Sequence, residues 1–377
     1  MFERIKFILI KEFLQILRDP KMRAILFLSP LLQIVIYGYA ANTDIQNIPT
    51  AAFDLDNTKE SRELIRRFKY SKYFNIKYYV YDEGREDELI DKTKVNTVIR
   101  INRGFGRELV GNKSANLQIV VDGTDSNTAN IILGYADAIV QRYASEAFDE
   151  RMQIYFKGGE VAYPKVDLRD RSWFNVNLIS RNYYIPGVIA LTITIMSLVL
   201  TSMAIVREKE VGTMEQLMVT PISPLELILG KLAPFGIIAI FQVTLLTAVG
   251  VFWFKIPMNG SVSLLFIATC VYLLTSLGVG LFISTISSTQ QEAVLSTFLF
   301  FFPASLLSGF MFPIMNMPKV IQYVTYLNPL RYYIVILRGI FLKGVGIKIL
   351  WPQILILLIM GTAIITLSSL WFKKRLV

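Results

Sequence analysis

Six long apolar runs constrain the fold of this chain more than any other feature of its sequence. None of them contains Asp, Glu, Lys, Arg or His. A run of about 18 or more apolar residues is long enough to cross the hydrocarbon core of a bilayer as a helix. We therefore predict an α-helical polytopic membrane protein with six transmembrane helices. These are residues 24–41, 185–206, 232–254, 262–286, 293–312 and 349–372.

The composition agrees with this class and excludes several functions. Hydrophobic residues make up 53% of the 377 residues, more than in an ordinary soluble domain. The absence of His excludes His-based catalytic triads and His-ligated metals, and a single Cys excludes an intrachain disulfide. The net charge of +10 fits the usual excess of Lys and Arg beside membranes. No basic helix or aromatic-basic motif indicates nucleic-acid binding.

Residues 1–20 form the predicted interfacial amphipathic helix, which ends at Asp19-Pro20. Apolar residues recur there at helical spacing, with polar residues opposite. The alternative is a cytosolic helix packed on a partner. The basic residues that precede the first span predict a cytoplasmic N-terminus, and six spans return the C-terminus to the same side. The apolar positions are Phe2, Ile5, Leu9, Phe13 and Ile16.

Residues 42–184 have a different pattern and form the predicted extracytoplasmic domain. Short β-like runs alternate with helical ones, which indicates a mixed α/β fold. The expected strands are residues 48–55, 75–81, 95–101 and 117–121, and the expected helices are residues 61–68, 85–92, 105–110 and 127–156. Residues 122–126 form a turn before the last helix and lack the spacing of a calcium-binding loop.

Residues 313–348 should also lie outside, although they carry five basic residues and no acidic one. An apolar stripe predicts two short helices that dip into the outer leaflet. Asn328 and Pro329 suit the N-cap and first position of the second helix, which should end near Gly344. Arg331 and Arg338 are expected to share a face and extend towards the headgroups.

Residues 207–231 form a charged segment between two uncharged spans, and we predict a cytoplasmic loop there. The lack of ionisable groups within the spans argues against ion-driven transport, because such relays use intramembrane charges. The chain also lacks a phosphate-binding loop, since Gly230-Lys231 stands outside the required pattern. Energy for any transport must therefore come from a partner.

Two sets of motifs resemble those of ABC-2 type transporter permeases. Residues 206–223, followed by Leu229-Gly-Lys231, are similar to the cytoplasmic coupling segment of that family. Residues 298–313 and 327–333, with Met317-Pro318, Arg338 and residues 342–344, are similar to its C-terminal signature. The large domain after the first span resembles the subgroup linked to multidrug or antibiotic export.

The resemblance implies a set of partners and site residues. ATP and Mg²⁺ would be bound by two copies of a separate ATPase subunit, so this chain would hold no cofactor, catalytic residue or metal. A second permease copy, identical or related, would complete the pathway, and a periplasmic adaptor is a further partner. The implied residues at the ATPase interface are Glu208, Glu210, Gly212, Thr213 and Glu215. A solvated inner loop is their alternative.

The resemblance also implies an outer gate, where Pro and Gly interrupt the helical hydrogen bonds of the fifth span. Ordinary helix packing is the alternative. Gln290 and Gln291 are candidates for the inner mouth of the pathway. The gate candidates are Pro303, Ser308, Gly309, Phe310 and Pro313.

The predicted function is the permease subunit of an ATP-driven exporter for an amphipathic or hydrophobic cargo, such as a drug-like compound or a lipid. The alternative is a membrane receptor or assembly scaffold that acts through its outer α/β domain. A channel is disfavoured, because the sequence contains no charged ring or filter-like loop.

Overall fold

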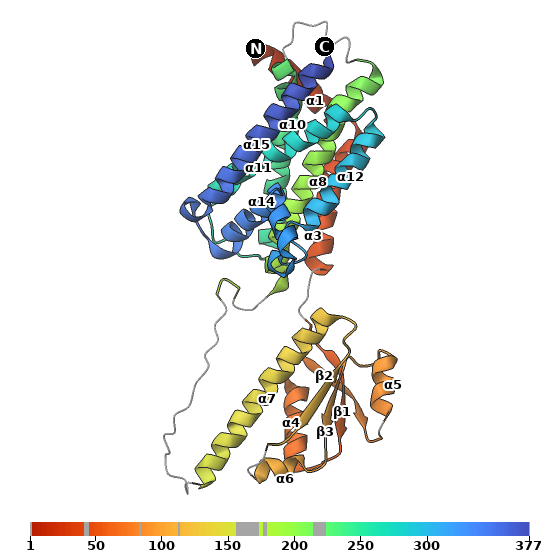
Figure 1. Ribbon diagram of the computed structural model, residues 1–377, viewed down its shortest axis with the longest axis vertical. Coiled ribbons are helices and arrows are strands. Elements are labelled where there is room, and N and C mark those ends of the chain that lie inside the picture. The colour runs from red at the N-terminus through yellow and green to blue at the C-terminus, as the bar shows by residue number, and fades with distance from the viewer. Residues whose placement is uncertain are drawn as a thin grey trace. The chain divides into compact units, whose positions relative to one another are not determined.

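The computed structural model describes residues 2–40, 45–82, 84–111, 114–155, 173–175, 179–213 and 224–376. The chain divides into two compact units (Figure 1). The helical unit combines Met1–Asn42 with Arg171–Val377, and the α/β unit is Thr43–Asp170. The predicted domain, residues 42–184, therefore extends too far, because Ser180 already begins a long helix of the helical unit.

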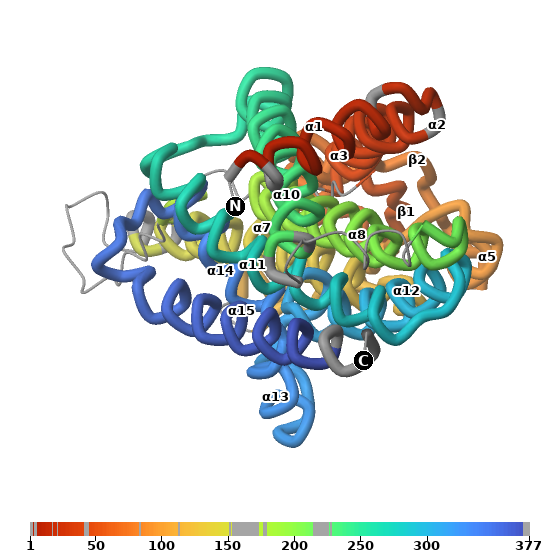
Figure 2. Tube along the Cα trace, turned by 90° about the horizontal axis from the view of Figure 1, so that it is seen from above, coloured from red at the N-terminus to blue at the C-terminus, as the bar shows by residue number. Residues whose placement is uncertain are grey.

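The helical unit is organised around α8 (Ser180–Val211), which packs against α3, α10, α11, α12 and α14 (Figure 2). Its residues 185–206 are apolar or uncharged all round, so no face of the helix needs water. The other elements are α1 (Phe2–Arg18), α2 (Pro20–Arg23), η1 (Ala24–Leu28), α3 (Ser29–Ala40), α10 (Pro224–Ala248), η2 (Val249–Trp253), α11 (Val262–Ile286), α12 (Gln290–Leu306), η3 (Ile314–Asn316), α13 (Lys319–Thr325), α14 (Pro329–Arg338), η4 (Gly339–Lys343) and α15 (Ile347–Leu376).

Four helices within the described residues are long and apolar enough to cross a membrane: Ser180–Val211, Ile228–Trp253, Val262–Ile286 and Ile347–Trp371. Ala24–Ala40 is a shorter apolar helix. The fifth predicted span, residues 293–312, is wrong at its end, because α12 stops at Leu306. Its apolar run continues, but the backbone turns and Gly309 takes a left-handed φ of 79°. The count of six spans stays a prediction.

The expected loop at residues 207–231 is helical at both described ends. Helix α8 continues to Val211, and α10 begins at Pro224. The predicted spans stop where the charged residues begin. In the structure both helices include those charged residues, because charged side chains do not interrupt the backbone hydrogen bonds of a helix. Residues 214–223 lie outside the described residues.

The predicted second helix of residues 313–348 is confirmed. The Asn328 side chain accepts a hydrogen bond from the Leu330 backbone, and Pro329 is the first residue of α14. The helical conformation continues through η4 and ends at Gly344, where φ is 65°. Only a residue that tolerates the left-handed region ends a helix this way without strain.

The α/β unit contains the predicted alternation of strands and helices, with boundaries within a few residues of those expected. The sheet order is β2-β1-β3-β4, with β1 parallel to β2 and β3, and β4 antiparallel to β3. The elements are β1 (Ile48–Asp54), α4 (Lys59–Tyr70), β2 (Phe74–Val80), α5 (Arg85–Asp91), β3 (Thr97–Ile101), α6 (Phe105–Val110), β4 (Leu117–Val121) and α7 (Ser126–Tyr155).

Both faces of the sheet are covered, which explains its nearly continuous apolar central strands. Helices α4 and α7 pack on one face, where Phe68 and Ile132 are fully buried. Helix α5 lies on the other side of the sheet (Figure 1). Its Leu89 belongs to one buried cluster with Phe53 and Val98.

Two acidic loops complete the α/β unit. The Asp56 carboxylate accepts hydrogen bonds from the backbone N–H groups of Gly104 and Gly106, at 2.6 and 2.8 Å. Thr58 begins α4 with a reciprocal capping box to Ser61. At the predicted turn before α7, Asp125 accepts the Asn127 backbone N–H at 3.1 Å. These carboxylates accept backbone hydrogen bonds at the N-terminal ends of α6 and α7.

Candidate coupling site and outer turn

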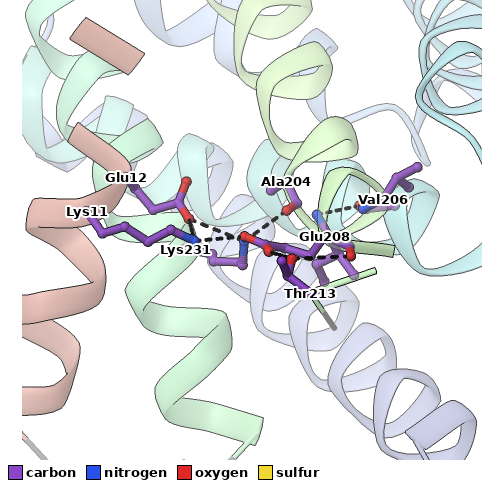
Figure 3. A network of polar contacts seen from close by, with 9 residues as sticks. Lys11, Glu12, Ala204, Val206, Glu208, Thr213 and Lys231 are labelled. Atoms are coloured by element: carbon purple, nitrogen blue, oxygen red, sulfur yellow. Dashed lines mark hydrogen bonds and ion pairs between the residues drawn. The ribbon is translucent and has the colours of Figure 1, made fainter. Parts of the chain in front are cut away.

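A buried cluster of charges joins three helices near the end of α8 (Figure 3). The Lys231 Nζ of α10 lies 2.9 Å from Glu208 Oε1 of α8 and 3.3 Å from Glu12 Oε1 of α1. It also donates to the Ala204 carbonyl at 3.0 Å. Lys231 is only 4% exposed, and both carboxylates are buried. Buried charges are tolerated when paired and hydrogen-bonded, and Lys231 has three acceptors.

A second lysine contacts the same carboxylate from the surface. Lys11 Nζ lies 3.0 Å from Glu208 Oε1, but its side chain is 53% exposed. Helix α1 approaches α10 closely, because a Cβ on Gly230 would come within 2.8 Å of Ile8. The apolar face of the predicted interfacial helix is thus partly used for packing, as Ile16 belongs to the core of the helical unit.

The turn after α8 depends on Glu208. Gly212 takes a φ of 76°, and the Thr213 backbone N–H donates to the Glu208 carbonyl at 3.0 Å. The Thr213 hydroxyl also donates to the Glu208 carboxylate. One side chain therefore joins the turn at residues 212–213 to Lys231 in α10 and, through Lys231, to α1.

The adjacent charges reach the connection between α11 and α12. Gln290 donates to the Glu210 carboxylate through its backbone N–H, at 2.7 Å, and through its side-chain amide. Lys209 Nζ donates to the Thr285 and Ser287 carbonyls at 3.2 and 3.3 Å. A cation at the C-terminal end of a helix is favourable. Gln290, predicted to line a mouth of the pathway, thus contacts Glu210.

The structure separates the predicted interface residues into two groups. Glu208 is buried, whereas Glu210 and Gly212 are exposed and Thr213 is half-buried. Glu215 lies outside the described residues. Sequence reasoning missed Lys231 as the shared partner of Glu208 and Glu12. A signal existed, because Lys231 is the only charged residue between Glu226 and Lys255. An isolated lysine within an apolar helix indicates a buried partner.

The predicted gate residues also differ in burial. Ser308, Gly309 and Phe310 are buried together, whereas Pro303 and Pro313 are exposed. The Ser308 hydroxyl donates to the Ser305 carbonyl at 2.6 Å and accepts from the Phe310 backbone at 3.2 Å.

The Phe310 side chain lies against α8. A Cβ on Gly187 would come within 2.4 Å of the Phe310 ring, and the Tyr184 ring meets it edge-on at 5.9 Å. The turn after α12 can therefore pack against α8 because Gly187 has no side chain.

The expectation that Arg338 extends towards headgroups is wrong. Its Nη1 donates to the Gly309 carbonyl at 3.1 Å, and its guanidinium lies over the Tyr183 ring at 3.7 Å. Arg331 instead stacks on Tyr326, at 4.1 Å from the ring centre. The aromatic faces and the turn carbonyl attract Arg338 inwards.

These features define a helical membrane protein with a compact α/β unit and a charged junction at the end of its central helix. A family model described as "ABC-2 family transporter protein" matches residues 20–370. The chain belongs to this family, as its motifs predicted.

Relatives match along essentially their whole length. The "Probable multidrug ABC transporter permease YbhR" of Escherichia coli is 33% identical, with all of both chains covered. The "Probable multidrug ABC transporter permease YbhS" of the same organism is 33% identical over all of this chain and 98% of its own. The "Inner membrane transport permease YhhJ" of Escherichia coli is 28% identical over 97% of this chain and 96% of its own.

Proposed function

We propose that this chain is the permease subunit of an ATP-driven exporter, moving an amphipathic or hydrophobic compound out of the cell. Family membership and relatives named multidrug permeases support this proposal. The uncharged interiors of the apolar runs favour a cargo with little need for ionic contacts. A drug-like compound or a lipid fits this description.

The proposed topology has six spans, cytoplasmic termini and the α/β unit, Thr43–Asp170, outside an inner membrane. The basic N-terminal segment supports this orientation, and YhhJ is named an inner membrane permease. In this topology the turn at residues 212–213 and residues 214–223 face the cytoplasm. Energy would come from two ATPase subunits that bind ATP and Mg²⁺, and a second permease copy would complete the pathway.

The observation that carries the proposal is the set of contacts that the Glu208 carboxylate makes with Lys231, Lys11 and Thr213. A partner that displaces the turn at residues 212–213 would act on Glu208, because Thr213 donates to its carboxylate. Glu208 belongs to the central helix α8 and shares Lys231 with α1. The displacement would therefore move α8 together with α1 and α10. The opposite end of α8 holds Gly187, against which Phe310 packs as the proposed outer gate.

Transport of the dye Hoechst 33342 in inverted membrane vesicles tests this proposal. Vesicles should contain this chain and its ATPase subunit, with empty-vector vesicles as the control. We expect dye movement that requires ATP and is not supported by a non-hydrolysable analogue. The variant Lys231→Met should reduce the rate, whereas the exposed Lys92→Met should not. Equal movement with and without this chain, or movement driven by a proton gradient alone, would contradict the exporter proposal.

A further inference from the structure

The α/β unit contains a cavity of about 400 Å³ beside α4, at the carboxyl ends of β1 and β2. Its floor is apolar and includes Ala52, Ile65 and Val80. The volume lies within the ~300–1,000 Å³ typical of small-molecule sites. Parallel sheets commonly bind ligands outside the carboxyl ends of their strands.

Helix α4 gives the cavity a surplus of positive charge. Arg62, Arg66 and Lys69 are four and three residues apart, so they share one face, and all three line the cavity. Asp54 is the one acidic residue among the described residues of the lining. Its carboxylate already accepts hydrogen bonds from the Ser61 hydroxyl and the Asn57 backbone, at 2.7 and 2.9 Å.

The three cations differ in how far they are engaged. Arg66 pairs with Glu63, and Arg62 donates to the Asn57 side chain at 3.2 Å. Lys69 forms no ion pair or hydrogen bond with any part of the chain that the structure describes. The ammonium group of Lys69 and most N–H donors of the Arg62 and Arg66 guanidinium groups therefore remain available to a ligand.

Three tyrosines complete the rim. Tyr79 of β2 lies opposite Ala52 of β1 in the sheet register, and Tyr81 follows directly after β2. Tyr70 ends α4. These side chains are 50%, 76% and 79% exposed, and their hydroxyls have no hydrogen bond within the described residues. Such rings offer flat apolar faces and free donors at once.

We propose that this cavity binds a small organic anion with a planar or apolar body. The body would lie on the apolar floor and the tyrosine rings, and a carboxylate, sulfonate or phosphate group would meet Arg62 and Lys69. The surplus positive charge disfavours cationic ligands. The apolar floor and the volume of about 400 Å³ favour a small molecule over an acidic peptide, which needs an extended groove. The inference is independent of the proposed transport function.

Equilibrium dialysis of the purified full chain in lipid nanodiscs tests the proposal, with empty nanodiscs subtracted. The probes are naphthalene-2-sulfonate, its neutral analogue 2-naphthylmethanol, and a tetraglutamate peptide as competitor. The pocket variant is Arg62→Gln with Lys69→Gln. The matched control is Lys94→Gln with Arg142→Gln, which removes the same charge from exposed positions outside the cavity lining.

We expect saturable binding of the sulfonate at one site per chain, weaker binding of the neutral analogue, and no displacement by the peptide. The pocket variant should bind the sulfonate about tenfold or more weakly, because two charge-assisted contacts are lost, whereas the control should bind normally. Equal binding to wild type and pocket variant would overturn the proposal. Displacement of the bound sulfonate by tetraglutamate would overturn it in favour of a peptide-docking surface, and so would the absence of saturable sulfonate binding in favour of no small-molecule site.

Discussion

Replacing Lys231 with methionine should destabilise the helical unit far more than the same change at Lys11. Both ammonium groups contact the same oxygen of Glu208, at 2.9 and 3.0 Å. They differ in burial, since the Lys231 side chain is 5% exposed and that of Lys11 is 53% exposed. Removing Lys231 leaves the buried carboxylates of Glu208 and Glu12 with Lys11 as the one cation that contacts them within the described residues.

The expected magnitudes follow from burial. Breaking a buried ion pair by removing one partner costs about 3–5 kcal/mol. Lys11 stays within reach of Glu208, so we expect the lower end, ~3 kcal/mol. An exposed pair contributes ~0–1 kcal/mol, which sets the expectation for Lys11→Met. With ~2–4 °C per kcal/mol for a unit of this size, Lys231→Met should lower Tm by roughly 6–12 °C.

Thermal unfolding of the full chain in detergent, followed by tryptophan fluorescence, measures both variants. The double variant Lys231→Met with Glu208→Gln should recover part of the loss, because it removes a charge that the single variant leaves unpaired. Equal Tm losses for Lys231→Met and Lys11→Met would refute the assignment of burial as the cause. Additive losses in the double variant would refute the coupling between Lys231 and Glu208.

Three further predictions concern other parts of the chain. Gly187→Ala should lower stability by ~1–3 kcal/mol through overpacking against Phe310, whereas Gly236→Ala, whose nearest neighbour would be 3.6 Å away, should not, as thermal unfolding will report. Burial raises the pKa of Asp56, but hydrogen bonds from Thr58 and from the Gly104 and Gly106 backbones outweigh it and lower the pKa overall. Its stabilising effect should be complete above the ordinary Asp pKa of ~4 and be lost as pH falls towards the lowered value; Asp56→Asn should flatten that acid dependence in circular dichroism. Tyr272→Phe removes the 2.5 Å hydrogen bond to the Thr194 hydroxyl, which keeps its bond to the Ala190 carbonyl, and should cost ~0.5–1.5 kcal/mol in the same unfolding assay.

Local patterns account for the features that the sequence predicted well. The strands of the α/β unit alternate with helices, and each element has its own period. Asn328, Pro329 and Gly344 determine the ends of their helical segment through capping chemistry that involves only neighbouring residues. Such features can be predicted because the interacting groups are close in the chain.

The features that the sequence did not predict depend on distant contacts. Lys231 and Glu12 are 219 residues apart, so their pairing requires knowledge of how α1 packs on α10. Hydropathy does not change at Leu306, where α12 ends, since the following residues are also apolar. Arg338 resembles a surface arginine in sequence, but Tyr183 and the Gly309 carbonyl come from other segments and draw it inwards.

The measurement that tests the central claim most directly is ATP hydrolysis by the separate ATPase subunit reconstituted with this chain. The test variant is Glu210→Arg with Glu215→Arg, and the control is Asp87→Arg with Asp91→Arg on the exposed side of α5. Gln290→Ala serves as a second control, because it removes the side-chain amide that donates to Glu210 but keeps the backbone N–H bond and the net charge. We predict that the test variant loses the complex or its coupled hydrolysis while both controls retain them. Unchanged binding and turnover in the test variant would contradict the assignment of this segment as the coupling site.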